Sequence, residues 1–203
     1  MFRFRKCIFI APCLLFPHIT ALGYCRKEDY NLAIKLLEYF YRRETNLVPY
    51  SCPEKILCEE KIKSFARIPS GKNTYLEFGI KEIAERVANQ IVKECSIMKE
   101  MGFEILGIIG IKNSPTCGIG TTKNRGTSSS DIIKFSKNWK ELGEREIEFF
   151  KNYKVAEINE DGVLFELLRK RLSIPFYAYD KSRSLEENIK ELENNFYSEN
   201  KVN

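Results

Sequence analysis

Residues 104–111 read EILGIIGI, an almost uninterrupted apolar run, and this stretch decides the fold class. A run of this length that is rich in β-branched residues predicts a strand buried on both faces, as in a parallel sheet covered by helices. A second run of this kind, KCIFIA at residues 6–11, ends at Pro12. The sequence therefore predicts at least two buried strands.

Segments with helical spacing of apolar residues separate the strands. The clearest is the long segment 74–101, which Gly102 ends in the manner of a helix C-cap. Further helices are expected at 29–43, 138–153, 162–172 and 185–197, and further strands at 47–50 and 176–179. Alternation of strands and helices predicts a three-layer αβα fold with a mainly parallel, Rossmann- or flavodoxin-like sheet.

Residues 1–203 show no internal repeat and no linker, so we expect a single domain. The run GIGTTKNRGTSSS at residues 118–130 is rich in Gly, Ser and Thr and predicts a loop, which is a candidate lid over a site. We take this loop to extend from Gly118 to Asp131.

The charge pattern bears on partners and location. The 33 basic and 28 acidic residues are mixed along the chain, with no basic block that could follow a phosphate backbone, so no nucleic-acid partner is expected. No membrane association is expected either. One alternative concerns the start of the chain, where Arg3, Arg5 and Lys6 precede an apolar run and imitate a signal peptide. Pro12 and Pro17 interrupt that run, and we expect a cytoplasmic protein.

The seven cysteines form an odd set without any C-x-x-C pair, which argues against a disulfide framework, a zinc ribbon and a thioredoxin-like motif. Cys13, Cys52 and Cys117 each follow a predicted strand. Because the carboxyl ends of parallel strands converge at one edge of the sheet, we expect these three to form one metal site. The other four, Cys7, Cys25, Cys58 and Cys95, are expected to pack as small apolar residues.

Three thiolates bind soft metals and leave a coordination position open for substrate, which suits catalysis. The alternative is that all seven cysteines are packing residues. Glu54, two residues after Cys52, is a candidate for moving protons, or else a helix-start carboxylate. Ser114 is placed either to bind substrate or to cap its own turn, and Asn113 and Gly118 flank it as further candidate substrate-binding residues.

The segment RIPSGKNTY at residues 67–75 precedes the long predicted helix. Its residues Arg67, Lys72 and Tyr75 could present cationic and phenolic groups to a polar ring. The alternative is an ordinary solvated loop. His18 is the only histidine, so catalysis by a Ser/His/Asp triad and multi-histidine metal sites are not expected.

The order C-L-L after the first strand, C-P-E after the second, and S-P-T-C-G after G-I-I-G-I resembles the thiouracil desulfidase family and its desulfidase relatives. The segment R-x-P-x-G-K-x-T-Y is similar to those relatives as well. The resemblance extends over residues 6–180. It implies a [4Fe-4S] cluster held by Cys13, Cys52 and Cys117, with one iron free to act as a Lewis acid toward the sulfur of a thiolated nucleobase.

The resemblance also implies hydrolytic desulfuration with release of sulfide, with Glu54 and Ser114 as catalytic residues and a small thiolated compound as substrate. The chain departs from the family pattern in two places. Pro12 and Phe16 stand where the family pattern has polar residues around the first cysteine, and after Gly162 the stretch VLFELL replaces a glycine-rich element. The second hypothesis is a non-catalytic sensor or binding module of the same fold, with a zinc ion or a cluster on three cysteines. The sequence does not settle the oligomeric state.

Overall fold

A four-stranded parallel sheet forms the centre of the computed structural model, which describes residues 4–21, 23–64, 67 and 69–197. Its strands are β1 (Lys6–Ile10), β2 (Thr45–Pro49), β3 (Glu104–Ile111) and β6 (Phe176–Tyr179), in the order β2-β1-β3-β6. All three pairings are parallel. An order that begins 2-1-3 is that of flavodoxin-like sheets, which bind ligands where the strand order reverses between β1 and β3.

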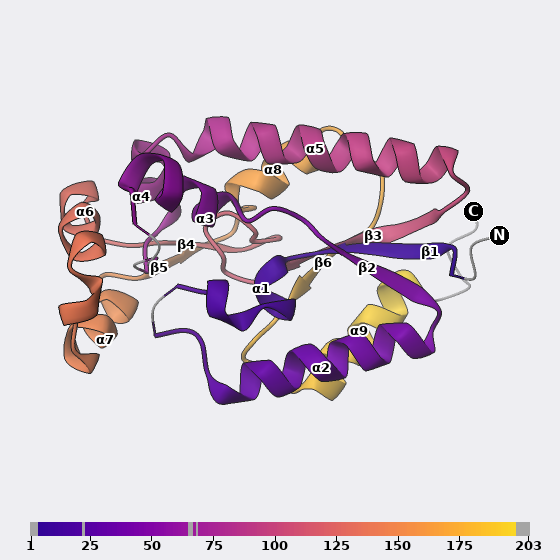
Figure 1. Cartoon of the computed structure of the whole chain (residues 1–203), viewed down its shortest axis with the longest axis horizontal. Helices are drawn as coiled ribbons and strands as arrows, with labels where there is room; N and C mark the ends of the chain where they lie inside the picture. Colours follow the sequence, from indigo (N-terminus) through magenta and orange to yellow (C-terminus); the bar gives the residue numbers. More distant parts are fainter. Residues whose placement is uncertain (1–3, 22, 65–66, 68, 198–203) are drawn as a thin grey trace.

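Helices cover both faces of this sheet (Figure 1). On one face lie α2 (Lys27–Arg42) and α9 (Leu185–Phe196), and on the other lie α5 (Ile80–Glu100) and α8 (Val163–Arg169). The apolar residues of β1 and β3 are almost completely buried between the two layers, as their sequences require. The prediction of a three-layer α/β fold with a mainly parallel sheet is confirmed.

Short helices occupy the connections near the carboxyl ends of the strands. They are α1 (Pro12–Leu15), a 3₁₀ turn (Pro17–Ile19), α3 (Pro53–Leu57), a π-helical turn (Cys58–Ile62) and α4 (Lys72–Glu77). Proline stands at the start of α1 and of α3, where its fixed φ suits the first helical position and its missing N–H costs nothing. These two helices place Cys13 and Cys52.

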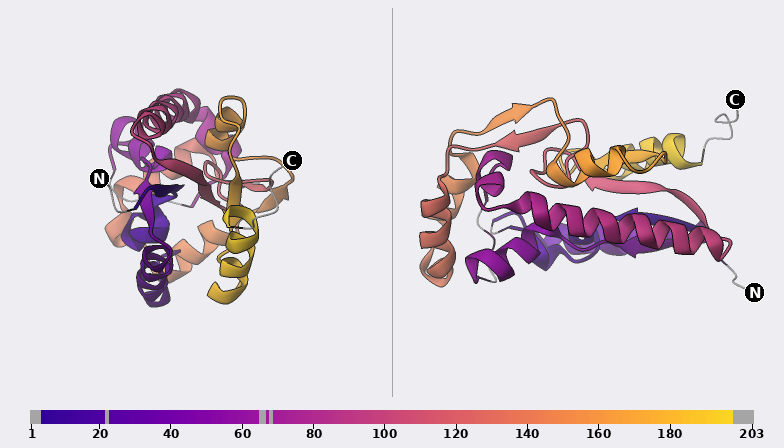
Figure 2. Two further views of the ribbon diagram at one scale, coloured as in Figure 1. Left: turned by 90° about the vertical axis from the view of Figure 1, so that its right-hand side faces the viewer. Right: turned by 90° about the horizontal axis from the view of Figure 1, so that it is seen from above.

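A smaller lobe lies at one end of the molecule (Figure 2). It contains the antiparallel pair β4 (Thr122–Asn124) and β5 (Ala156–Ile158), together with α6 (Ser129–Lys137), a 3₁₀ turn (Trp139–Glu141) and α7 (Glu144–Asn152). The prediction of a structureless loop from Gly118 to Asp131 is wrong in part, because this segment contains β4 and the start of α6. The Ser128 hydroxyl accepts the Asp131 N–H and caps α6, which explains the helix start.

The helix predicted over residues 74–101 is two helices in the structure. Gly79 has φ of +77° and separates α4 from α5, so the chain bends where only glycine adopts the required conformation without cost. The helix expected over residues 138–153 is likewise divided, into the 3₁₀ turn and α7. The remaining predicted elements are found within a few residues of their expected bounds.

The predicted signal-peptide alternative concerns a segment that begins in residues 1–3, outside the described part of the chain. Lys6–Ile10 of that segment is β1, at the centre of the sheet. In the described residues, no helix combines the length and the apolar character that crossing a membrane requires.

Candidate three-cysteine site

The three cysteines lie at one edge of the sheet because the strands before them end side by side. The Ala11 N–H donates to the Ile109 carbonyl and the Tyr50 N–H donates to the Ile10 carbonyl, so β1, β2 and β3 end in register. Cys13 then lies in α1, and Cys52 is the residue that starts α3. Cys117 lies in the turn after β3, and the Cys117 carbonyl accepts the Ile111 N–H.

Gly110 allows this turn to fold back onto β3. A Cβ atom at Gly110 would collide with the Cys117 carbonyl oxygen, with Ile119 and with Phe165. Gly118, a predicted substrate-binding residue, has a similar role, since a Cβ atom there would collide with the Ser114 and Thr121 carbonyl oxygens. Both glycines are therefore needed for close backbone packing around Cys117.

The three thiols share one electrostatic environment. Burial raises the pKa of Cys13 to about 12, with a further contribution from Cys52 and an opposing one from Lys181. Burial likewise raises the pKa of Cys52, while Arg67 lowers it. Burial raises the pKa of Cys117 well above its ordinary value, and Cys52 raises it further. Thiols that raise one another's pKa lie close together, so the structure brings the three predicted cysteines to one place.

These cysteines differ in exposure. Cys52 and Cys117 are buried, at 8% and 5% exposed, whereas Cys13 is partly exposed. Cys58 lies beside this group as a fourth buried thiol: burial raises its pKa to about 12, Arg67 opposes this, and Glu54 and Cys52 add to it. Cys7 and Cys95 are buried elsewhere in the core, and Cys25 is exposed. Among the residues that the structure describes, no group of three or more His, Cys, Asp or Glu side chains has a geometry that could hold a single metal ion.

Glu54 is the centre of the polar part of the site. Its Oε2 atom pairs with Arg67 Nη2 at 2.9 Å and accepts the Tyr75 hydroxyl at 3.3 Å, while Oε1 accepts the Thr116 hydroxyl at 2.7 Å. All four residues are at least nine-tenths buried. The carboxylate is thus paired and hydrogen-bonded, which is the condition under which a charge can be buried.

Arg67 joins this carboxylate to the cysteines. Its Nη1 atom donates to Cys52 Sγ at 3.1 Å while Nη2 holds Glu54. Burial by itself lowers the pKa of Arg67, but the negative charge of Glu54 and the Cys52 sulfur outweigh this and raise the pKa well above its usual range. Arg67 is therefore a permanent cation between a carboxylate and a sulfur.

Two buried phenols complete the wall of the site. Tyr75 contacts Glu54, and burial together with that carboxylate raises the pKa of Tyr75 well above its ordinary value. The Tyr50 hydroxyl donates to the Ile109 carbonyl at 3.3 Å, and burial followed by the effects of Cys117 raises the pKa of Tyr50 in the same way. Both side chains are thus neutral hydrogen-bonding groups beside the cysteines.

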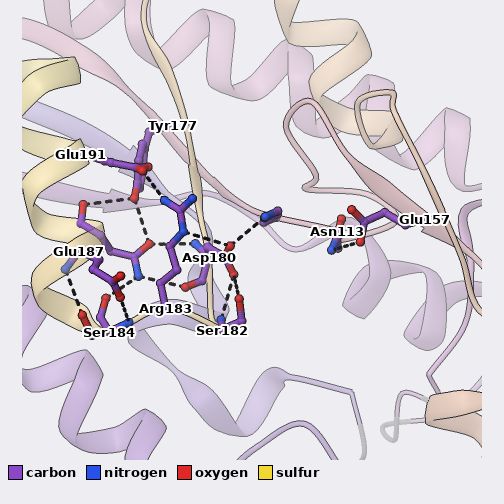
Figure 3. Close-up of polar contacts among 11 residues, drawn as sticks. Asn113, Glu157, Tyr177, Asp180, Ser182, Arg183, Ser184, Glu187 and Glu191 are labelled. Carbon is purple, nitrogen blue, oxygen red and sulfur yellow. Dashed lines mark hydrogen bonds and ion pairs between the residues drawn. The ribbon is translucent and has the colours of Figure 1, made fainter.

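Other predicted site residues have structural partners. The Ser114 hydroxyl accepts the Cys117 N–H at 3.1 Å and so caps the turn. This is the capping role that the sequence offered for Ser114 beside substrate binding. The Asn113 amide donates to Glu157 on β5, and its φ of +63° lies in the left-handed region where asparagine is tolerated. Asn113 therefore links the edge of β3 to the smaller lobe, as the right-hand part of Figure 3 shows.

Lys72 bonds to other groups than the three cysteines and Glu54 in the part of the chain that the structure describes. Its ammonium donates to Glu166 at 2.6 Å and to the Asp161 carbonyl at 2.9 Å, and it pairs with Glu160 at 3.2 Å. Lys72 thus holds α4 against the start of α8. Of the predicted substrate-binding residues, Arg67 and Tyr75 lie in the site, and Lys72 serves the packing of helices.

The fold and the site define an α/β protein with a buried cluster of thiols, a carboxylate and a guanidinium at the carboxyl ends of its parallel strands. The family model described as putative 2-thiouracil desulfurase matches residues 5–198, and the chain belongs to this family. None of the curated proteins and none of the solved structures matches the chain. The family predicted from the sequence is confirmed, and its match extends beyond residues 6–180 to include α9.

Sequence reasoning missed three residues of the site, Thr116, Tyr50 and Lys181. Thr116 stands directly before Cys117, and its hydroxyl contacts both Glu54 and the Cys117 sulfur, the latter at 3.5 Å. Tyr50 had been assigned only to a strand. A systematic look at polar residues within two positions of each candidate cysteine would have found both, but not Lys181, which follows β6.

Proposed function

We propose that this protein removes sulfur from a thiolated nucleobase such as 2-thiouracil, or from a similar small thiocarbonyl compound, and releases it as sulfide. Water supplies the oxygen, so a C=S group and one water become a C=O group and hydrogen sulfide, without net oxidation or reduction. The observation that supports this most directly is a buried carboxylate, Glu54, held beside three thiols by Arg67, Tyr75 and Thr116.

We further propose that Cys13, Cys52 and Cys117 hold a [4Fe-4S] cluster. The donor set suits it: three thiols that each follow a different parallel strand, with the buried Cys58 next to Cys52 as a further thiol. When bound, the cluster supplies a Lewis-acidic iron for the substrate sulfur.

In this proposal the protein's own side chains bind, orient and move protons. Glu54 accepts a proton from the attacking water, since a carboxylate in an ion pair is in the form that takes up protons. Arg67, Tyr75 and Thr116 fix the two carboxylate oxygens and so define where the water lies. The burial of these groups keeps bulk water away from the reacting carbon, which strengthens each electrostatic contact.

The test begins with protein purified without oxygen. We expect brown protein with iron and acid-labile sulfide near four of each per chain, and release of sulfide and uracil from 2-thiouracil. Colourless protein, or protein that contains only zinc, would refute the cluster. A protein that carries the cluster but releases no sulfide from any thiolated base would instead support the non-catalytic sensor hypothesis.

Single replacements test the ligand assignment with a matched control. Cys13→Ser, Cys52→Ser and Cys117→Ser should each lower the iron content severalfold, because each removes one of three thiolate ligands. Cys95→Ser serves as the control, since Cys95 is buried on α5 and lies outside the group. Equal iron loss in all four variants would contradict the assignment.

A further inference from the structure

Lys181 follows β6 directly, and its ammonium has no hydrogen-bond partner in the part of the chain that the structure describes. The Nζ atom is nevertheless buried. Asp29 Oδ1 lies 3.8 Å from this Nζ atom, too far for a hydrogen bond but near enough to balance the charge. A buried donor without a partner is costly and requires an explanation, of which a ligand is one.

Lys181, whose Nζ atom is covered although its side chain is 23% exposed, differs in this respect from four other cations of the chain. Arg67 and Arg125 each leave one Nε atom without a partner, but their remaining nitrogens bond to protein atoms. Lys72 and Lys112 have carboxylate partners at 2.6 Å and 2.9 Å. The ammonium of Lys181 thus keeps three donors free while Asp29 supports its charge.

The turn that carries Lys181 is rigid. The Asp180 carboxylate accepts the Ser182 N–H and hydroxyl and pairs with Arg183, as the dashed lines of Figure 3 show. The Asp180 N–H donates to Asn188 Oδ1, and the Asn188 amide returns a hydrogen bond to the Asp180 carbonyl. The residues on both sides of Lys181 are therefore fixed, so its side chain starts from a defined position.

This turn lies at the same edge of the sheet as the three cysteines. The Lys112 N–H, just past β3, donates to the Tyr179 carbonyl at the end of β6. Asp29 lies in the first turn of α2, and α2 packs against α1, the helix that contains Cys13.

We propose that Lys181 binds an oxygen of the substrate on the side of the site next to the partly exposed Cys13. The substrate class is then a thiolated heterocycle that also carries a carbonyl or anionic oxygen on the ring, as 2-thiouracil does at ring position 4. Arg67 is held by the protein through both terminal nitrogens, which contact Cys52 and Glu54, whereas the ammonium of Lys181 has no hydrogen-bond partner in the described residues. This inference rests on the proposed function and adds a specificity-determining residue to it.

The experiment compares the binding of two non-identical ligands to full-length, anaerobically purified protein by titration calorimetry. One ligand is 2-thiouracil, or the product uracil in its place. The other is 2-mercaptopyrimidine, which lacks the oxygen at ring position 4. A charged hydrogen bond contributes enough for a tenfold or larger difference in Kd. Wild-type protein should therefore bind the oxygen-bearing ligands about tenfold more tightly, and Lys181→Met should abolish that difference.

Two further variants separate recognition from folding. Lys181→Arg retains the charge and the donors and should keep most of the preference. Lys55→Met removes the same charge from a lysine after β2 that pairs with Glu59 at 2.9 Å on the surface, and should leave the preference unchanged. Iron content and thermal midpoint, measured for each variant, identify any change that arises from loss of the fold or of the cluster.

The outcomes are distinct. If Lys181→Met weakens both ligands equally, or neither, the inference is overturned while the proposed function stands. If wild-type protein binds none of the ligands, the proposed function fails and the inference with it. Loss of preference in Lys181→Met with normal iron content and thermal midpoint supports the inference.

Discussion

Replacement of Arg67 by methionine tests the electrostatic organisation of the site. The variant keeps most of the side-chain volume but leaves the Glu54 carboxylate buried without its cation. Arg67 Nη2 and Glu54 Oε2 lie 2.9 Å apart, and both side chains are less than one-tenth exposed. Removal of one partner of a buried ion pair costs about 3–5 kcal/mol, because the remaining charge is uncompensated. We expect a loss of that size in the free energy of unfolding.

The measurement is urea unfolding of metal-free protein at pH 7, followed by circular dichroism, so that cluster loss does not contribute. A second variant, Arg67→Met combined with Glu54→Gln, removes the stranded charge and should recover a large part of the stability. Arg86→Met is the matched control, since Arg86 pairs with Glu60 at 2.6 Å on the surface, where ion pairs contribute little. If Arg67→Met were no more harmful than Arg86→Met, or if the double variant were the least stable, the reasoning would be refuted.

Two further predictions concern the support of the site. Burial alone raises the pKa of Asp180, but hydrogen bonds from Ser182 and Lys112 bring it down to about 2, below the ordinary 3.8. A lowered folded-state pKa stabilises the protein above pH 3.8, and this stabilisation disappears as the pH falls through 2. Asp180→Asn should therefore lower the free energy of unfolding by about 2 kcal/mol at pH 7 and by roughly half of that at pH 3. An equal loss at both pH values, measured by urea unfolding, would contradict the assignment. Gly110→Ala should push the turn of Cys117 away from β3, lowering stability by about 1–3 kcal/mol in urea unfolding and lowering the iron content as well, whereas unchanged iron would show that the turn adapts.

The fold was predictable from the sequence where burial is complete. β1 and β3 lie at the centre of the sheet, so their sequences are continuous apolar runs, and the helices between them show one apolar face. The short strands β4 and β5 gave no such signal, because each has three residues and they pair only with each other. Gly79 was not recognised as a helix break, since its effect comes from φ and not from hydrophobic pattern.

The candidate site was predictable in part. The positions of Cys13, Cys52 and Cys117 after three strands follow from the sequence, because parallel strands end at one edge. Arg67 and Tyr75 both bond to Glu54 and are almost fully buried, while their predicted role in substrate binding stays a prediction. Which loop residues bond to one another depends on tertiary packing, and no local pattern contains that information.

The distribution of charge explains how such a site exists in the folded, metal-free chain. Burial favours the neutral form of the three thiols, so they bring no net charge into the core. Glu54 remains as an anion and has Arg67 as its counter-ion, while the ammonium of Lys181 is balanced by Asp29. The two terminal nitrogens of Arg67 thus contact Cys52 and Glu54, whereas the ammonium of Lys181 has no hydrogen-bond partner in the described residues. If the cysteines bind a metal as thiolates, they must lose their protons, and Lys181 and Arg67, both of which lower the pKa of Cys13, would stabilise the negative charge then gained.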